Sequence, residues 1–322
     1  MAKIADWDDH IGRRLRLRDL RVFFAVVEFG SIAKAAIQLR VSQPAVSQVI
    51  ADLEHTLGVR LFDRSSRGVE PSLYARALLA RGRVAFDELR QGIKDIEFLA
   101  DPTAGELRIG YPESISATIL PVLIERFFEK YPRVVMRTDV VPSPVFKFPG
   151  LLDRTYDLFL ARMPMPAPQD YPANDLNIEV LFDDPVVIVA GLHSPWSRRR
   201  KIDLAELAGA PWILSPPGTW LYACVAQAFA AKGLEMPKPS LISYAMDLRV
   251  KLPARGQFIT GVANSVLRGD GDRPALKKLP VDLPQQPWRV VILTLKNRTL
   301  SPVVERFVEC AREVTKALAT QS

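Results

Sequence analysis

The sequence predicts a multidomain α/β protein in which a mostly helical N-terminal third, ending in one long helix, precedes two α/β lobes. Only two of the 26 prolines stand before residue 102, and apolar residues in that stretch recur at helical spacing. Beyond residue 106, apolar runs of strand length alternate with amphipathic helical segments. A chain of 322 residues is long enough for two or more domains.

Residues 1–12 show no periodic pattern, and residues 1–16 are expected to form a basic tail that leads into a first helix. Leu20, Phe23 and Val27 lie on one face of that helix, which ends at Gly30. This helix is expected to pack behind the two that follow.

Two short helices joined by a tight turn are predicted within residues 31–57. Their apolar residues fit helices buried on one side. Ser31 and Ser42 each precede a helix, where a hydroxyl can accept from a free backbone N–H, and Pro44 falls in a first turn that needs no donor. With Arg40-Val41-Ser42 as the turn, the pair is a candidate helix-turn-helix, whose second helix would enter a DNA major groove.

The outward face of the second helix consists of short or amide-bearing, uncharged residues: Gln43, Pro44, Ser47, Gln48 and Ala51. Amides and hydroxyls can read base edges, and small residues allow close approach to the groove floor. The alternative is an ordinary helical hairpin with a polar face towards solvent. Periodicity alone favours neither interpretation.

The distribution of charge favours a nucleic-acid partner. Between Arg13 and Arg83 stand 13 Lys or Arg and 6 Asp or Glu, so the whole net charge of +7 lies there, and the remaining residues hold 30 of each sign. A local basic surplus is typical of proteins that bind polyanions. Alone it also describes a solvated surface, but its coincidence with the helix pair favours DNA.

A small wing is expected after the second helix, in residues 57–72. Short strand pieces flank a polar turn that contains Arg64 and Arg67, with Arg60 close by. Guanidinium groups at a loop tip suit phosphate oxygens. A solvated hairpin tip is the alternative.

A long helix is predicted from residue 72 to residue 100. Its apolar positions keep a seven-residue repeat: Ala75, Leu79, Gly82, Phe86, Leu89, Ile93, Ile96 and Ala100. Gly82 and Gly92 weaken it as an isolated helix, so it is expected to pair with a second copy of the chain. Such a pair would present two DNA-binding modules to a two-part operator.

The rest of the chain predicts two α/β lobes with parallel sheets, joined by hinges near residues 176–182 and 283–288. We expect lobe I to comprise about 106–178 and 287–322, and lobe II about 179–286. The whole chain then divides as follows: a basic tail, 1–16; a winged helix-turn-helix, 17–72; a linker and dimerisation helix, 73–101; and a two-lobe domain, 106–322.

Composition and motifs argue against a membrane protein and an enzyme. No apolar run reaches the ~18 residues of a membrane span, and residues 1–10 lack the apolar core of a secretory signal. Cys224 and Cys310 lack metal-ligand spacing, and the three histidines lie far from any candidate nucleophile. No catalytic or nucleotide-binding motif occurs. We therefore expect a cytoplasmic protein without catalytic residues, metal or cofactor.

Residues 17–100 resemble the N-terminal part of LysR-type transcriptional regulators through FxxVxExGSxxxAAxxLxVSQPAVSxxIxxLExxLGVxLFxRxxRGV. The resemblance implies a winged helix-turn-helix, a dimerising linker helix and an effector-binding domain with a periplasmic-binding-protein-like fold. It also implies that residues of the second helix face DNA bases and that residues of the wing hold the DNA backbone. The predicted DNA contacts are Arg40, Ser42, Gln43, Pro44, Ser47, Gln48, Arg64 and Arg67. Two departures make the operator harder to infer: Gln48 replaces a frequent arginine, and Tyr74-Ala75 replaces alanine-glycine.

An effector is expected beyond the carboxyl ends of strands and at helix N-termini, where family members bind theirs. The predicted effector-binding residues are Ser114, Ser116, Ser143, Arg162 and Thr219, with Pro216 and Met246 as walls. Arg162 follows an apolar run and can fork onto a carboxylate, unless it forms a structural ion pair. Ser114 and Thr219 are alternatively plain helix caps.

The sequence thus predicts a bacterial DNA-binding transcription regulator, activator or repressor, that forms a homodimer or homotetramer and responds to a small, anionic effector. The sequence leaves open whether RNA polymerase is a further partner. The rival interpretation is a ligand-binding or enzymatic α/β protein whose N-terminal segment serves only oligomerisation.

Overall fold

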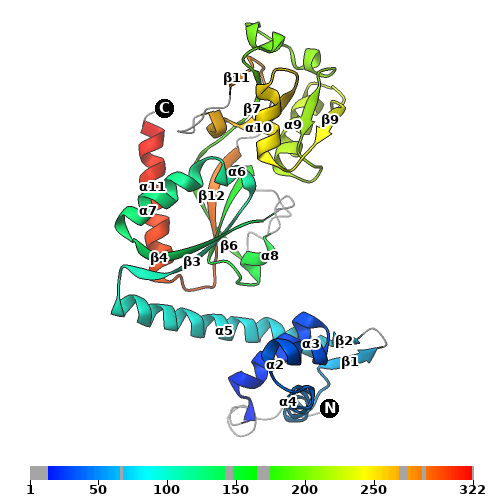
Figure 1. The fold of residues 1–322 in the computed structure, drawn as a ribbon, viewed down its shortest axis with the longest axis vertical. Helices are drawn as coiled ribbons and strands as arrows, with labels where there is room; N and C mark the ends of the chain where they lie inside the picture. The colour runs from blue at the N-terminus through cyan, green and yellow to red at the C-terminus, as the bar shows by residue number, and fades with distance from the viewer. Residues whose placement is uncertain are drawn as a thin grey trace. The chain divides into compact units, whose positions relative to one another are not determined.

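The computed structural model describes residues 14–65, 68–141, 148–164, 175–267, 275–284 and 288–320. The chain forms two compact units, Met1–Leu89 and Arg90–Ser322, drawn in Figure 1. Among the described residues, no helix combines the length and the apolar character that a membrane crossing requires.

The first unit is built on three helices, α2 (Leu17–Phe29), α3 (Ile32–Leu39) and α4 (Gln43–Leu57). They share an apolar core that includes Phe23, Val26, Ala35 and Val46. Gly30 and Gly58 end α2 and α4 in the left-handed conformation that glycine adopts without strain. The predicted three-helix arrangement is confirmed.

The connection between α3 and α4 is the tight turn that the sequence predicts. Ser31 Oγ accepts from the N–H of Lys34, and Ser42 Oγ accepts from that of Ala45, each at 3.4 Å. Arg40 adopts the left-handed conformation, with φ of 56°, and its N–H donates back to the end of α3. These local bonds stop α3 and restart the chain as α4 within three residues.

The wing consists of β1 (Phe62–Ser65) and β2 (Gly68–Pro71), which pair antiparallel. The backbone N–H of Val69 donates to the carbonyl oxygen of Gly30 at 3.1 Å. The wing is thereby fixed to the end of α2, and the predicted hairpin is confirmed as a structural element.

The predicted apolar seam of helix α5 (Leu73–Ala100) is partly buried near the N-terminal end of the helix and exposed towards its C-terminal end. The N-terminal part packs within the first unit, where Ala75 is buried and Phe86 meets Phe24 at a ring-centroid distance of 5.2 Å. Gly82 permits this close approach, because a Cβ would lie 2.8 Å from Phe24 Cζ and the ring would have to shift. This part of the seam is therefore partly covered within its own unit, and its pairing with a second chain stays a prediction.

The second unit contains two five-stranded sheets, and the first forms one lobe. Its strands in spatial order are β4 (Arg133–Val140), β3 (Ala104–Tyr111), β5 (Leu158–Pro164), β12 (Trp288–Leu295) and β6 (Leu176–Asp183). Strand β3 is parallel to β4 and β5, but β12 runs antiparallel to β5 and β6. The sheet is mixed, not parallel as expected, because β12 re-enters it from the other lobe.

Helices cover both faces of this first sheet. They are α6 (Glu113–Ser116), α7 (Ile119–Lys130), α8 (Pro149–Leu152) and α11 (Pro302–Thr320). Leu158 and Leu160 of β5 face the core under α7 and α11, whereas Phe159 and Met163 face the core beside α8 (Figure 1). Helices α6 and α7 are separate, because Thr118 between them leaves helical geometry with φ of −134° and ψ of −94°.

The second sheet forms the other lobe. Its strands in spatial order are β11 (Leu276–Lys278), β7 (Val186–Gly191), β10 (Ile259–Ala263), β8 (Trp212–Leu214) and β9 (Pro239–Ile242). Its helices are α9 (Trp220–Ala231), α10 (Met246–Ala254), η2 (Pro195–Arg198), η3 (Leu204–Leu207) and η4 (Asn264–Leu267). This sheet is mixed as well, since β7 runs antiparallel to β10 and β11.

The chain crosses between the lobes at two adjacent places. Strand β6 stays in the first sheet to Asp183, so the first crossing follows residue 183 and not residue 178. The return crossing ends where β12 begins at Trp288. The backbone N–H of Asp184 donates to the carbonyl oxygen of Trp288 at 2.8 Å, which ties the two crossings together.

Candidate functional site

Helix α4 presents the predicted uncharged face to solvent. Ser42, Gln43, Pro44 and Gln48 are exposed and Ser47 is half-buried. The opposite face is buried in the core of the unit. Gln48 donates from Nε2 to Asp52 Oδ1 at 2.8 Å, so its amide is already held by its own helix. The structure thus leaves Gln43 as the exposed amide on α4 for which it gives no such contact.

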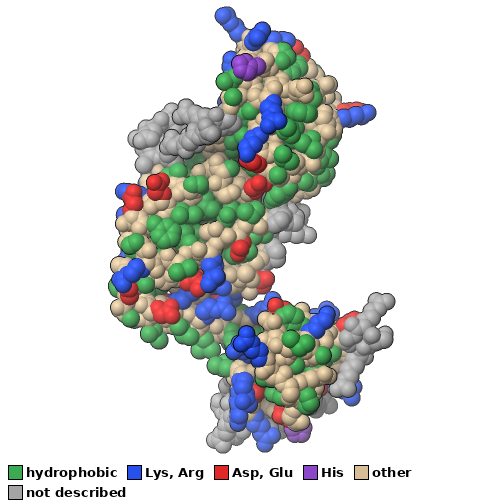
Figure 2. Space-filling model, in the orientation of Figure 1, with side chains coloured by type: hydrophobic (Ala, Val, Ile, Leu, Met, Phe, Trp, Pro, Cys, Tyr) green, Lys and Arg blue, Asp and Glu red, His purple; other side chains and the backbone are tan. Residues whose placement is uncertain are grey.

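Arginines lie on either side of this face. Arg40 is exposed at the turn before α4, and Arg60 is exposed after it. Arg64 belongs to β1, whereas Arg67 lies outside the described residues. Figure 2 shows Lys and Arg side chains at the visible edges of this unit. Arg40 and Arg60, which contribute to the basic surplus, are therefore exposed directly before and shortly after α4.

Glu54 joins α4 to the wing, a role that we did not predict. Its Oε1 accepts from the backbone N–H of Leu61 at 2.7 Å and from that of Phe62 at 3.2 Å. Both N–H groups belong to the entry into β1, so the carboxylate fixes the wing relative to the helix. Asp52 lies two residues earlier on the same helix, so the sequence alone does not show which carboxylate meets the wing.

A cavity of about 40 Å³ lies between the two lobes of the second unit. Three predicted effector-binding residues line it: Ser114, Arg162 and Thr219. The lining residues that were not among the predicted contacts include Glu113, Ser215, Trp220, Tyr244 and Arg249. They follow β3, β8 and β9, at the carboxyl ends of strands where α/β proteins bind ligands.

Arg162 lines this cavity, but protein groups already hold its guanidinium. Its side chain is fully buried and forms an ion pair with Asp184. Nε donates to Ser114 Oγ at 3.3 Å, and Nη2 donates to Thr118 Oγ1 at 3.2 Å. Burial lowers the pKa of Arg162, while the charge of Asp184 opposes that shift. The structural ion pair, our alternative for this residue, is therefore what the structure contains.

Asp184 connects Arg162 to the second lobe. Its Oδ1 accepts from the backbone N–H of Ser265 at 2.9 Å, and its Oδ2 accepts from Ser265 Oγ at 2.7 Å. Arg162 Nη2 also donates to Ser265 Oγ at 3.3 Å. These bonds span the first crossing between lobes, so this group of residues sets the relative position of the two lobes.

Arg249 and Glu113 differ from Arg162, because parts of their polar groups are buried and unpartnered. Within the described residues, Nε and Nη1 of Arg249 and Oε2 of Glu113 have no hydrogen-bond partner. Burial lowers the pKa of Arg249, and the charges of Glu113 and Tyr244 oppose that shift. Unpaired buried charged groups are expensive, which marks this part of the cavity as a place for a ligand.

Among the other predicted effector residues, Thr219 lines the cavity and also caps a helix, whereas Ser116, Met246 and Pro216 do not line it. Thr219 caps α9, as our alternative stated, by accepting from the N–H of Tyr222 at 3.4 Å. Ser116 Oγ donates to the carbonyl oxygen of Glu113, and Met246 is buried in the core of the second lobe. Neither these two nor Pro216 is among the lining residues, and Ser143 lies outside the described residues.

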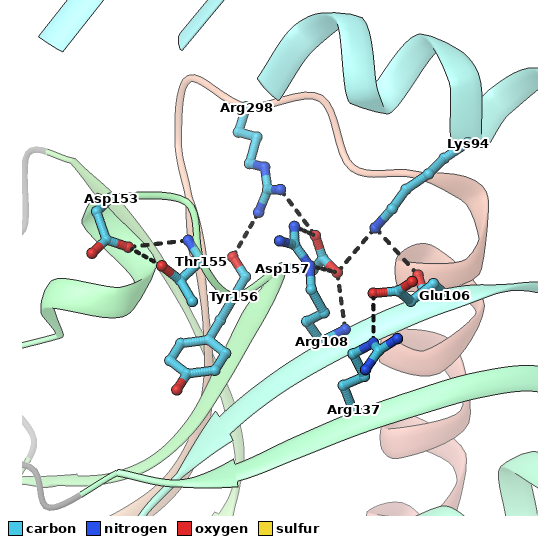
Figure 3. A network of polar contacts seen from close by, with 9 residues as sticks. All are labelled: Lys94, Glu106, Arg108, Arg137, Asp153, Thr155, Tyr156, Asp157 and Arg298. Atoms are coloured by element: carbon cyan, nitrogen blue, oxygen red, sulfur yellow. Dashed lines mark hydrogen bonds and ion pairs between the residues drawn. The ribbon is translucent and has the colours of Figure 1, made fainter. Parts of the chain in front are cut away.

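A second buried charge cluster lies in the first lobe, centred on Asp157 (Figure 3). Lys94 Nζ, Arg108 Nη2 and Arg298 Nη2 approach its carboxylate at 3.1, 2.8 and 2.9 Å. Burial raises the pKa of Asp157, but the Arg108 hydrogen bond and the three cations lower it further, to about 2. Because Lys94 belongs to α5, the cluster holds the end of that helix to the lobe.

The two units each match a known protein family. Residues 17–76 match the bacterial regulatory helix-turn-helix protein, lysR family, and residues 100–316 match the LysR substrate binding domain.

Similar proteins extend over nearly the whole chain. The transcriptional dual regulator GltC of Bacillus subtilis is 28% identical over 92% of this chain and 96% of its own. The HTH-type transcriptional regulator GbpR of Azospirillum brasilense is 26% identical over 92% of this chain and 85% of its own.

Solved structures share the fold. Full-length CbnR complexed with its target DNA has a TM-score of 0.62 at 22% identity, covering 93% of this chain and 99% of that one. The effector binding domain of QuiR in complex with shikimate has a TM-score of 0.54 at 19% identity, covering 66% of this chain and 98% of that one.

Proposed function

This chain belongs to the LysR family of bacterial regulators, and from that premise we propose how it works as a DNA-binding transcription regulator. Helix α4 reads bases in the major groove, and a small effector in the cavity between the lobes modulates promoter binding. The family covers both units of the chain, so the DNA-binding and effector-binding parts act within one protein.

The exposed, uncharged face of α4 is the observation that supports this proposal most. Gln43 and Ser42 offer an amide and a hydroxyl to base edges, and Ala45 and Pro44 let the backbone approach the groove. Arg40, Arg60 and Arg64 hold phosphates of the DNA backbone. The chain shares its fold with CbnR, which has been solved in complex with its target DNA.

Self-association through residues 73–101 completes the DNA-binding form. Leu89, Ile93, Ile96 and Leu99 of α5 are exposed apolar side chains near the C-terminal end of the helix. A second copy of the helix covers them, because such a stripe on a soluble surface marks an interface. The homodimer, paired again into a tetramer, presents two or more modules to the promoter.

The effector is a small molecule with a carboxylate, held by Arg249 in the cavity rather than by the occupied Arg162. Ser114, Ser215 and Thr219 contribute hydroxyls around it. Ligand binding changes transcription only if the ligand prefers one of two arrangements of the oligomer. The protein acts on chromosomal DNA in the bacterial cytoplasm, where RNA polymerase is its further partner.

The test is retention of genomic DNA fragments by the purified full-length chain. Wild type should select a few fragments, and Gln43→Ala should bind them about 5- to 100-fold more weakly, which is the range of a base contact. Gln38→Ala, an exposed glutamine on α3, is the matched control and should bind as wild type does. Failure of wild type to retain any duplex would favour the rival in which the first unit serves only oligomerisation.

A further inference from the structure

Two ionisable side chains, buried Arg249 and half-buried Glu113, line the cavity from opposite lobes. Arg249, on α10 of the second lobe, is 5% exposed. Glu113, on α6 of the first lobe, follows β3 directly. Within the described residues, the Arg249 atoms Nε and Nη1 and the Glu113 atom Oε2 are buried without a hydrogen-bond partner. The cavity therefore contains both donors and an acceptor that the protein itself leaves unsatisfied.

The other ionic group at the cavity is already balanced. Arg162 forms its ion pair with Asp184 and lies over the Trp220 ring, with the guanidinium carbon 5.4 Å from the centroid. The hydroxyls of Ser215 and Thr219 also bond to each other, at 2.8 Å. What is left for a ligand is one cation and one anion, which together carry no net charge.

We propose that the cavity binds a small zwitterionic amino acid, whose carboxylate accepts from Arg249 and whose ammonium group donates to Glu113. This inference rests on the proposed function, in which the cavity is the effector site, and it names the chemical class of that effector. An inorganic anion or a simple carboxylic acid would satisfy Arg249 but leave the Glu113 oxygen unpaired. An amine without a carboxylate would satisfy Glu113 but leave the Arg249 donors unpaired.

The size and walls of the cavity agree with this class. A volume of about 40 Å³ is roughly three times what one water molecule requires, so it suits a compact head group. Trp220, Phe159 and Tyr244 provide aromatic lining next to the charged pair. A ligand carboxylate beside Arg249 also offsets the burial that lowers the pKa of its guanidinium.

The position of the two side chains links binding to the arrangement of the lobes. Glu113 belongs to the first lobe and Arg249 to the second, so one ligand bonded to both bridges them. Closure of the lobes around the ligand then depends on both bonds. Loss of either side chain should weaken binding of the same ligand, since each half of the zwitterion needs its own partner.

The experiment measures thermal stabilisation of the full-length protein by each of the twenty L-amino acids, followed by calorimetric titration of the best ligand. Arg249→Met and Glu113→Gln should each raise the Kd for that amino acid at least about tenfold, the usual loss for a charged hydrogen bond. The matched control is Lys251→Met, an exposed cation on the same helix, which should leave the Kd unchanged. The 2-hydroxy acid analogue should bind at least about tenfold more weakly than the amino acid.

Several outcomes would overturn the inference. They are stabilisation by none of the twenty amino acids, equal binding of the hydroxy acid, and an unchanged Kd in either variant. Arg249→Lys keeps the positive charge but removes the planar guanidinium group with its several donors. The unfolding midpoint of this variant without ligand shows whether the protein still folds. DNA retention is measured on the same samples: wild type that binds DNA but no amino acid removes only this inference, whereas loss of DNA binding removes the proposed function.

Discussion

Replacing Asp157 with asparagine should destabilise the second unit strongly, in a way that depends on pH. The carboxylate has a side-chain exposure of 1% and contacts Lys94, Arg108 and Arg298. Asparagine keeps the shape of the side chain but removes the charge that these three cations share. The substitution therefore tests the electrostatic role of the cluster rather than its packing.

The magnitude follows from the pKa of Asp157, which is about 2 in the folded protein against 3.8 for the free side chain. At 1.36 kcal/mol for each pKa unit, the ionised carboxylate contributes about 2 kcal/mol of stability at neutral pH. Removing one partner of a buried ion pair costs about 3–5 kcal/mol in general. We therefore expect Asp157→Asn to lower the unfolding free energy by at least about 2 kcal/mol. Because the folded pKa is depressed, this contribution is complete above about pH 4 and is lost as pH falls through about 2.

The assay is urea unfolding between pH 7 and pH 2.5, followed by tryptophan fluorescence. Four of the five tryptophans report on the second unit: Trp196, Trp212, Trp220 and Trp288. Glu106→Gln is the control, because Glu106 and Arg137 form an exposed pair whose loss should cost less than about 1 kcal/mol. A loss below about 0.5 kcal/mol in Asp157→Asn at pH 7, or one that does not shrink on acidification, would refute this reasoning.

Three further substitutions test other parts of the structure. Glu54→Ala leaves the two N–H groups at the start of the wing without their acceptor, so it should destabilise the first unit by about 1–3 kcal/mol and weaken DNA binding. Urea unfolding and fragment retention measure the two effects, and a variant that equals wild type in both its unfolding free energy and its DNA binding would contradict the prediction. Ile93→Arg places a charge on the exposed stripe of α5 and should raise the dimer dissociation constant at least about tenfold in sedimentation experiments, whereas an unaltered dimer would place the interface elsewhere. Asp184→Asn leaves Arg162 buried without a counter-charge and should lower the unfolding free energy by about 3–5 kcal/mol; a stable variant would mean that the pair does not hold the lobes.

The helices and the wing were predictable because their signals are local. Ser31 and Ser42 cap the helices that their positions predict, and Gly30 and Gly58 end helices through backbone conformations that few other residues adopt. Strand direction was not predictable in the same way. The apolar run 289–295 identifies a strand, but nothing within it shows that the chain enters the sheet from the opposite end.

The cavity was predictable in place but only partly in composition. Ser114 and Thr219 follow strands, and the general position of ligand sites in α/β sheets points to them. The sequence left open whether Arg162 meets a ligand or a carboxylate of the protein, because its partner Asp184 comes 22 residues later and spacing does not show which carboxylate meets which cation. Arg249 was missed for the same reason: α10 also contains Lys251, and only the packed structure distinguishes the buried cation from the exposed one.

The salt dependence of DNA affinity tests the central claim most directly. If Arg40, Arg60 and Arg64 each neutralise one phosphate in both modules of a dimer, the logarithm of the association constant should fall with the logarithm of salt concentration at a slope of about −5. Titration of a selected fragment between low and moderate salt measures that slope. A steep negative slope is the predicted result, and an affinity that does not change with salt would contradict the assignment of the first unit as a DNA-binding module.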